Sequence, residues 1–354
     1  MSKKRVIVVD DSAFMRSTIS RLIEKDARME VIDTARDGVE AIEKVCSLKP
    51  DIVTMDIEMP NKNGLEALAE IMERCPTRVV MVSSLTEAGA QETLRALELG
   101  AVDFFPKSMQ DSDKSIFAKS DILRDKIYNA SLIESLDTLK NPEPAHEAQS
   151  EVKVTPQSGS QLRFRRGQII VIGISTGGPK ALHAIMPLLP ATLRAPVLIV
   201  QHMPPNFTGA MARRLDSISP LSVSEAEDGV TLEPGHVYIA PGGMQTTVVK
   251  KDIALKFVVK ADNENSIYKP SVELATESIH NAVGGNVLAV MMTGMGSDGL
   301  KGFTKLKAAG AYVIAQDQET CVVYGMPKAV VEKGLANEVL PLAAIPQTIE
   351  RLLG

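Results

Sequence analysis

The sequence predicts an α/β protein made of two domains with parallel sheets, and three observations lead to this prediction. Short β-branched runs alternate with amphipathic helical patterns along most of the 354 residues, which is typical of doubly wound sheets. Residues 141–167 interrupt the alternation with Pro, Ser, Gln and Glu, a composition typical of a flexible linker. The length is sufficient for two cores of ordinary size. We expect one domain at residues 1–125, a long helix and linker at 126–167, and a second domain at 168–354.

The first domain is expected to contain five strands and five helices in alternation. Helical patterns include residues 13–25 and 87–99, and the last helix is expected to be long, at about residues 116–140. The expected strands are centred on residues 6–9, 31–32, 51–55, 79–82 and 102–105. This order predicts a (βα)5 doubly wound sheet.

The second domain continues the same alternation. A run of alternating residues between 237 and 259 predicts a β-hairpin inserted into a doubly wound α/β core. The expected core strands are residues 168–172, 197–200, 287–292 and 312–315.

Composition and charge exclude several classes of protein. The net charge of −5 argues against the basic stripe of a nucleic-acid-binding protein. The apolar run at residues 6–9 is too short for a signal peptide, and the one at 287–292 is too short for a membrane span. The cysteines Cys46, Cys75 and Cys321 are odd in number and far apart. We therefore expect no disulfide framework and a reducing, cytoplasmic location.

Acidic side chains gather where strands of the first domain end. Asp10 and Asp11 follow the first strand and Asp56 follows the third, while Ser83 ends the fourth and Lys107 follows the fifth. Carboxyl ends of parallel strands share one edge of the sheet, and three carboxylates there suit Mg²⁺. Lys107 and Ser83 could both contact a phosphoryl group. Any one of the aspartates alone could instead cap a helix or lie in a solvated loop.

With these residues, the stretch from 1 to about 125 resembles a response-regulator receiver domain. The resemblance implies that Asp56 accepts a phosphoryl group from a histidine kinase. It also implies that Asp11, Asp56 and the carbonyl of Glu58 hold Mg²⁺, assisted by Asp10.

The same resemblance implies that Ser83, Phe104 and Lys107 are the residues that respond to phosphorylation. Two departures from the family pattern are visible. Phe104 stands where tyrosine is common, and it has no hydroxyl group to donate. Lys107 is followed by Ser108, so the usual cis Lys-Pro bond cannot form there.

Ser175 is the candidate nucleophile of the second domain. The stretch 173–177, Gly-Ile-Ser-Thr-Gly, matches the G-x-S-x-G turn between a strand and a helix. Gly178 and Pro179 then begin the helix, whose N-terminus carries a partial positive charge that suits a developing oxyanion. Taken alone, Ser175 could equally be a helix cap.

A serine nucleophile needs a base, and His202 is the best candidate. It follows the strand at 197–200 in the same way that Ser175 follows its own strand, and Asp298 follows the strand at 287–292. Three such residues at three strand ends on one sheet edge predict a Ser-His-Asp triad. Individually, His202 could be a core histidine and Asp298 a helix cap. The other histidines fall in the linker, in helices or in a turn: His146, His183, His236 and His280.

Two competing interpretations concern the same half of the chain. Residues 294–299 fit G-x-G-x-x-G after a strand, and Asp317 ends the next strand, as in NAD-binding proteins. However, Asp298 would then place a carboxylate where the pyrophosphate binds. Cys321 could be proposed as a nucleophile, but no histidine stands beside it in the pattern, which favours a buried thiol.

Four stretches give the second half its resemblance to the catalytic domain of the chemotaxis protein-glutamate methylesterases: residues 173–179, 201–204, 268–272 and 293–299. The resemblance implies Ser175 as nucleophile, His202 as base and Asp298 as its orienting acid. The oxyanion donors would be Met295, through its backbone N–H, and Thr176. In residues 268–272 we expect only a helix start capped by Ser271.

The resemblance implies an activity that demethylates glutamate methyl esters on chemoreceptor helices, releasing methanol, and deamidates receptor glutamines. No metal is expected at the triad, and the partners would be the receptor and the kinase. The unphosphorylated first domain is expected to cover the triad until Asp56 is phosphorylated. The alternative is a receiver-controlled domain that only binds a partner.

Overall fold

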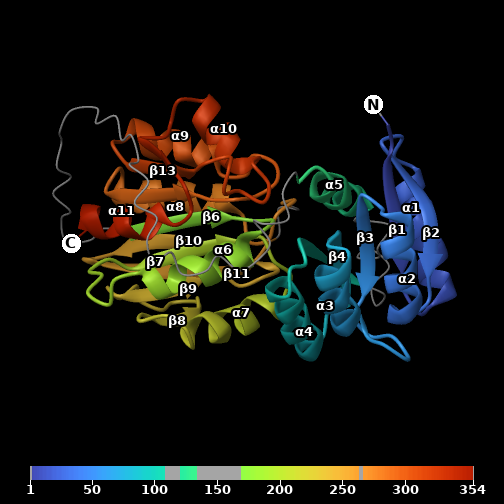
Figure 1. Ribbon diagram of the computed structural model, residues 1–354. Coiled ribbons are helices and arrows are strands. Elements are labelled where there is room, and N and C mark those ends of the chain that lie inside the picture. The colour runs from blue at the N-terminus through green and yellow to red at the C-terminus, as the bar shows by residue number, and fades with distance from the viewer. Residues whose placement is uncertain (1, 108–119, 134–168, 263–265, 354) are drawn as a thin grey trace. The chain divides into compact units, whose positions relative to one another are not determined.

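The computed structural model describes residues 2–107, 120–133, 169–262 and 266–353 (Figure 1). The chain divides into two compact units, Met1–Asn141 and Pro142–Gly354. Each unit is an α/β fold with a parallel sheet, as expected. The predicted linker at 141–167 lies outside the described residues, so the domain limits at 125 and 167 stay predictions.

The first unit alternates strands and helices in the predicted order. Strand β1 forms from a β-branched run, and helix α1 begins after Ser12, whose side chain accepts a hydrogen bond from the backbone N–H of Met15. The elements are β1 (Lys4–Val9), α1 (Ala13–Glu24), β2 (Met29–Ala35), α2 (Gly38–Leu48), β3 (Ile52–Asp56), α3 (Gly64–Arg74), β4 (Arg78–Ser84), α4 (Glu87–Glu98), β5 (Asp103–Lys107) and α5 (Ser120–Ser131).

All five strands of this unit are parallel, in the order β2-β1-β3-β4-β5. Helix α1 packs with α5, while α2, α3 and α4 pack in sequence. The carboxyl ends of β1 and β3 are neighbours in this order, which brings Asp10 and Asp56 together. Helix α5 ends at Ser131, earlier than expected, and the expected residues 116–119 and 134–140 lie outside the described part.

The prediction of no disulfide is wrong. Cys46, in α2, is bonded to Cys75, the C-cap residue directly after α3, across a sequence separation of 29. The two helices pack against each other, so residues far apart in the chain become neighbours. Cys321 is the remaining cysteine, and it is a buried free thiol as predicted.

The second unit contains a larger parallel sheet. Its seven strands follow the order β14-β13-β12-β6-β7-β9-β8. The elements are β6 (Ile169–Ile174), α6 (Gly178–Ile185), the 3-10 helix η2 (Met186–Leu188), β7 (Val197–Gln201), α7 (Phe207–Asp216), β8 (Ser222–Glu225), β9 (His236–Ile239), β10 (Met244–Lys251), β11 (Ala254–Ala261), α8 (Val272–Val283), β12 (Val287–Met291), α9 (Leu300–Ala308), β13 (Tyr312–Gln316), α10 (Met326–Glu332), β14 (Glu338–Leu340) and α11 (Ala344–Leu353).

The inserted hairpin consists of β10 and β11, which pair antiparallel as a separate sheet. It is shorter than predicted, because residues 236–239 form β9 and pair in parallel with β7 and β8 in the main sheet. Val248, Leu255 and Phe257 of the hairpin belong to the same buried core as helices α8 and α9. The hairpin is therefore anchored on one face of the main sheet, next to α8 (Figure 1).

Among the described residues, no helix combines the length and the apolar character that crossing a membrane requires.

Candidate active site and acidic cluster

The acidic cluster of the first unit forms as predicted. One carboxylate oxygen from each of Asp10, Asp11 and Asp56 lies within 4.8 Å of the others. Lys107 reaches the same place from β5, and its Nζ lies 2.7 Å from Asp10 Oδ2 and 2.7 Å from Asp56 Oδ2. One ammonium group therefore offsets part of the repulsion between three carboxylates.

Burial determines the charge balance of this cluster. Asp56 is 5% exposed, and burial raises its pKa to about 6 despite the opposing effect of Lys107. Burial alone would lower the pKa of Lys107, but the Asp56 charge and the bonds to Asp10 and Asp56 outweigh it and raise that pKa. A carboxylate that resists ionisation in this way gains from an additional cation.

The donor set fits Mg²⁺, because all the converging atoms are carboxylate oxygens and one of the three aspartates is exposed to water. Asp11 also lines a surface pocket together with Glu58, the other expected contributor. The cluster thus has the chemistry of a magnesium site of a receiver domain.

The predicted switch residues lie in the interior of the unit. The Ser83 hydroxyl accepts a hydrogen bond of 2.7 Å from Thr93 of α4 and donates to the Ser84 carbonyl. Phe104 is buried in β5, with the Lys126 ammonium 5.8 Å from its ring centroid. Their role as switches stays a prediction. The peptide bond between Lys107 and Ser108 lies outside the described residues.

In the second unit, Ser175 stands directly after β6, the strand between β12 and β7. Its backbone N–H donates to the Thr293 carbonyl at 2.9 Å, and its carbonyl accepts from Gly178 at 2.8 Å. Helix α6 has Gly177 as its N-cap, in a left-handed conformation (φ 78°), and no side chain caps it. The Ser175 hydroxyl is therefore not a helix cap.

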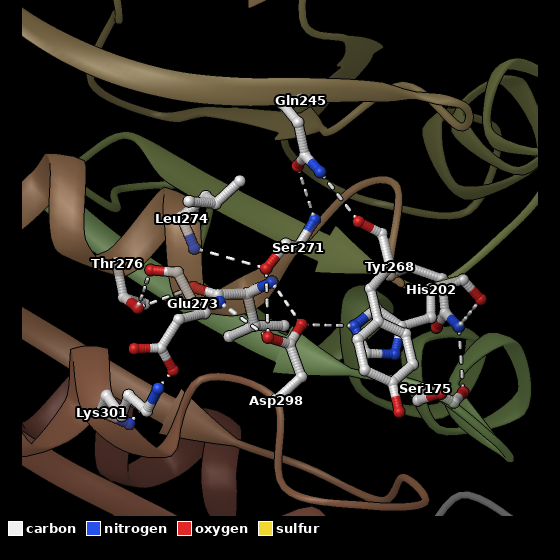
Figure 2. Close-up of polar contacts among 12 residues, drawn as sticks. Ser175, His202, Gln245, Tyr268, Ser271, Glu273, Leu274, Thr276, Asp298 and Lys301 are labelled. Carbon is white, nitrogen blue, oxygen red and sulfur yellow. Dashed lines mark hydrogen bonds and ion pairs between the residues drawn. The ribbon is translucent and has the colours of Figure 1, made fainter. Parts of the chain in front are cut away.

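His202 follows β7, and its backbone N–H donates to the carbonyl of Ile174 on the neighbouring strand at 3.1 Å. This bond aligns the residue after β7 with the end of β6. The imidazole Nε2 lies 2.7 Å from Asp298 Oδ2. Figure 2 shows the imidazole between the Asp298 carboxylate and Ser175. The structure thus brings the three predicted triad residues to one edge of the sheet.

Asp298 is held by four hydrogen bonds. Besides His202, it accepts from the Ser271 hydroxyl at 3.1 Å and from the backbone N–H groups of Val272 and Glu273 at 2.7 and 3.1 Å (Figure 2). These last donors belong to the first turn of α8, where the helix dipole favours a negative charge. Burial raises the pKa of Asp298, but the His202 bond and these N–H groups outweigh it and lower the pKa.

The two ring nitrogens of His202 have different surroundings. Nε2 faces Asp298, whereas Nδ1 is buried and has no hydrogen-bond partner among the residues that the structure describes. When Nε2–H donates to the ionised Asp298, Nδ1 carries the lone pair. Nδ1 therefore keeps a lone pair that can accept a proton, and the role of His202 as the base for Ser175 stays a prediction.

The loop after β12 carries the expected oxyanion donor Met295. The residue before it, Gly294, lies very close to Ser175, because a Cβ atom at Gly294 would be 2.8 Å from the Cβ of Ser175. The Thr293 hydroxyl donates to the carbonyl of Thr176 at 2.9 Å, which fixes the other expected donor residue. Thr176 follows Ser175 and Met295 follows Gly294 in the chain, and the oxyanion role of both stays a prediction.

Sequence reasoning assigned no role to three residues that shape this site. The buried Gln201 side chain donates to the carbonyls of Ser175 and His202, at 2.9 and 3.1 Å. Tyr268 stacks on His202, and Gln245 of β10 holds the segment that carries Tyr268. Gln201 and Tyr268 stand in stretches that carried the family resemblance, but no sequence signal marked Gln245.

The competing interpretations find no support in the geometry. A pyrophosphate would have to bind at the start of α9, directly after residues 294–299, but Asp298 places a carboxylate just before that helix, bonded to His202 and to the start of α8. The Asp317 carboxylate accepts from the backbone and hydroxyl of Thr320 and closes its own turn. Cys321 is buried, and burial together with Asp317 raises the pKa of its thiol, which does not suit a nucleophile.

Each of the two units matches a known protein family. Residues 6–115 match the family model of the response regulator receiver domain, and residues 170–349 match that of the CheB methylesterase. A curated relative from Thermotoga maritima is 45% identical over 99% of this chain and 98% of its own length. The chain belongs to the CheB methylesterase family.

The Thermotoga relative and one from Lawsonia intracellularis are both called protein-glutamate methylesterase/protein-glutamine glutaminase. The Lawsonia protein is 44% identical over 99% of each chain. Among solved structures, the catalytic domain of the Thermotoga maritima CheB methylesterase is 46% identical. It covers 52% of this chain and 98% of its own, with a TM-score of 0.51. The fold class predicted for this CheB-family chain is thereby confirmed, whereas the NAD-binding and binding-module alternatives are unsupported.

Proposed function

We propose that this chain hydrolyses glutamate methyl esters on chemoreceptors and deamidates receptor glutamines, under control of its receiver domain. The names of two relatives that match nearly its whole length state these two activities. The observation that carries the proposal is the 2.7 Å pair of His202 and the buried Asp298 beside Ser175. A nucleophile, a base and an orienting acid at one edge suit acyl transfer.

In the proposed mechanism, the Ser175 hydroxyl attacks the ester carbonyl while Nδ1 of His202 takes its proton. Asp298 keeps the proton on Nε2 and stabilises the imidazolium. The imidazolium then gives its proton to the leaving methoxide, and methanol departs. A water molecule, activated by the same nitrogen, attacks the acyl-enzyme and releases glutamate and free Ser175. With a glutamine side chain the leaving group is ammonia.

The oxyanion of the tetrahedral intermediate would be stabilised by backbone N–H groups of Met295 and Thr176. Losing one such donor costs about 2.7–4 kcal/mol of barrier in comparable enzymes. This chemistry requires no metal at the triad.

For the first unit we propose that Asp56 accepts a phosphoryl group from a histidine kinase. Mg²⁺ held by Asp10, Asp11, Asp56 and the Glu58 carbonyl would neutralise charge on the transferred group. Lys107 is placed to contact a phosphoryl oxygen, since its ammonium already bonds Asp56. Because a histidine kinase and the receptor substrate would both be met in the cytoplasm, we propose this location.

Regulation forms part of the proposal. We expect the unphosphorylated receiver to restrict access of a bulky helical substrate to the triad. Phosphorylation of Asp56 would shift Ser83 and Phe104 and relieve the restriction. The support is the presence of both family domains in one chain.

The direct test measures methanol release from methylated chemoreceptor by the wild-type protein and by Ser175→Ala. We expect the variant to lose at least about 10³-fold in kcat, because an activated nucleophile has no substitute. Ser222→Ala is the matched control, since Ser222 is exposed on the outer strand β8. Equal release by Ser175→Ala and the wild type would contradict the proposed mechanism.

A further inference from the structure

The imidazole of His202 lies face to face with an aromatic ring. The ring centroids of His202 and Tyr268 are 4.3 Å apart, and the ring planes differ by 7°. Figure 2 shows the tyrosine ring directly over the imidazole, in the space between Asp298 and Ser175. A hydrogen bond from one ring nitrogen leaves an imidazole free to tilt. A parallel ring against its face removes that freedom.

The position of Tyr268 is fixed by a side chain from the hairpin. The Gln245 amide nitrogen donates to the Tyr268 carbonyl at 2.8 Å, and its oxygen accepts from the Ser271 N–H at 2.9 Å. Gln245 is 8% exposed, so both bonds are shielded from water and costly to break. A single amide thus closes the segment from Tyr268 to Ser271.

The same segment also holds the acid of the candidate triad. Ser271 donates its hydroxyl proton to Asp298 at 3.1 Å and caps α8, whose first N–H groups bind that carboxylate. The far end of the Tyr268 ring lies beside the loop after β12, because a Cβ atom at Gly296 would lie 3.2 Å from the tyrosine oxygen. Tyr268 therefore extends from the imidazole to the loop that carries Asp298.

We propose that Tyr268 is a positioning residue that keeps the His202 imidazole in the plane joining Asp298 to Ser175. This inference rests on the proposed role of His202 as the base. The stacked face keeps Nδ1 directed at the serine, excludes water from one side of the ring, and attracts the positive charge that the ring acquires during the reaction. The aromatic face is the active feature, and the hydroxyl group is not required.

The test compares Tyr268→Phe with Tyr268→Leu in the full-length protein, with methanol release from methylated receptor as the readout. Tyr268→Phe keeps the stack, and we expect its kcat within about threefold of the wild type. Tyr268→Leu removes the stack, and we expect kcat to fall by about 10- to 100-fold, as for a misplaced catalytic group. KM should change little, because the lost contribution acts in the transition state.

Tyr238→Leu is the matched control. Tyr238 stacks on His236 with the same centroid separation of 4.3 Å, but in β9, and its histidine pairs with Ser224 instead of the triad. This variant should lose thermal stability yet keep the kcat of the wild type per folded molecule. Tyr268 is only half-buried, so its variants should fold. If the leucine variant does not fold, the comparison is repeated with Tyr268→Met, whose unbranched side chain is longer but also lacks a ring.

Two results would overturn the proposal: a wild-type kcat in Tyr268→Leu, or equal damage in Tyr268→Phe and Tyr268→Leu, which would make the hydroxyl the important group. Ser175→Ala is assayed in parallel. If Ser175→Ala remains active, the proposed function itself fails. If Ser175→Ala is inactive while Tyr268→Leu keeps its kcat, only the positioning role of Tyr268 fails.

Discussion

At the scale of single residues, two buried aspartates behave in opposite ways. Asp56 receives one backbone N–H, from Ile57, and shares the Lys107 ammonium with Asp10, so burial prevails and its pKa rises to about 6. The side chain of Asp298 is also buried, at 5% exposed, but the hydrogen bonds that it accepts outweigh burial and lower its pKa. The number of donors around a buried carboxylate decides whether the charged form is favoured. The first aspartate suits a cation, and the second suits an imidazolium.

Because the pKa of Asp298 is lowered in the folded state, the free energy of unfolding should depend on pH in the acidic range. A group whose pKa is lower in the folded state stabilises that state above its unfolded pKa, near 3.8, and loses this contribution as the pH falls through the folded pKa. Asp298→Asn should reduce the free energy of unfolding at pH 7 by about 1.5–3 kcal/mol, the range for hydrogen bonds to a charged group. The difference from the wild type should shrink as the pH falls below about 4.

Urea unfolding of residues 168–354 at pH 7 and pH 3.5 measures this difference. Asp252→Asn, at the exposed hairpin turn, is the control and should show no such change with pH. A gap between Asp298→Asn and the wild type that stays constant across this range would contradict the assignment.

At the scale of elements, packing between helices joins residues that are distant in the chain. The start of α8 fixes Asp298, although Asp298 lies just before α9. The first residue of α6, Gly178, packs so tightly on Gln201 at the end of β7 that a Cβ atom there would collide with the Gln201 side chain. In the first unit, α2 and α3 carry Cys46 and Cys75 into bonding distance. Each case depends on which elements are neighbours.

The disulfide between α2 and α3 should stabilise the first unit when it is oxidised. Closing a loop of this length contributes at most about 3–4 kcal/mol in the chain-entropy description. We expect residues 1–141 to have a higher free energy of unfolding without reductant than with it, measured by urea titration. In the reducing cytoplasm proposed above, the thiols would be kept reduced.

Cys75→Ser is the matched control, because it cannot form the disulfide. Its free energy of unfolding should be the same with and without reductant. Mass measurement first verifies that the bond is present in the wild type. If the wild type is then equally stable with and without reductant, the bond adds nothing to stability.

At the scale of the whole molecule, two independent parallel sheets carry two chemistries. The receiver unit places carboxylates and one lysine at its strand ends, and the second unit places a serine, a histidine and an aspartate at its own. Both use the edge where the carboxyl ends of parallel strands meet. The proposed control by phosphorylation would therefore link two sites of the same architectural kind.

The proposed restriction predicts a faster enzyme when the receiver is removed. Deleting residues 1–140 should raise basal methanol release by about tenfold, which corresponds to a blocking contact worth about 1.4 kcal/mol. The full-length Asp56→Asn variant cannot be phosphorylated and should remain at the basal rate when phosphodonor is added. A truncated enzyme no faster than the unphosphorylated whole protein would rule out inhibition by the receiver.

Most of the fold could be predicted because strands and helices have local signatures. The runs at residues 6–9 and 169–172 are β-branched and apolar, and both form strands of a parallel sheet. The limits of the hairpin could not be predicted, because residues 236–239 have the same alternation as β10 but pair in the main sheet. Local pattern determines the type of an element, whereas its partners depend on long-range contacts.

For the site, the sequence by itself determined which residues follow strands, and hence the candidates Ser175, His202, Asp298 and the acidic cluster. Only the tertiary structure decided which atoms face each other. It placed Nε2 of His202 on Asp298, Tyr268 over the imidazole and Gln245 behind Tyr268. The physical reason is that strand ends are set by local chain geometry. Stacking and buried hydrogen bonds join residues tens of positions apart, and they form only when the whole unit has packed.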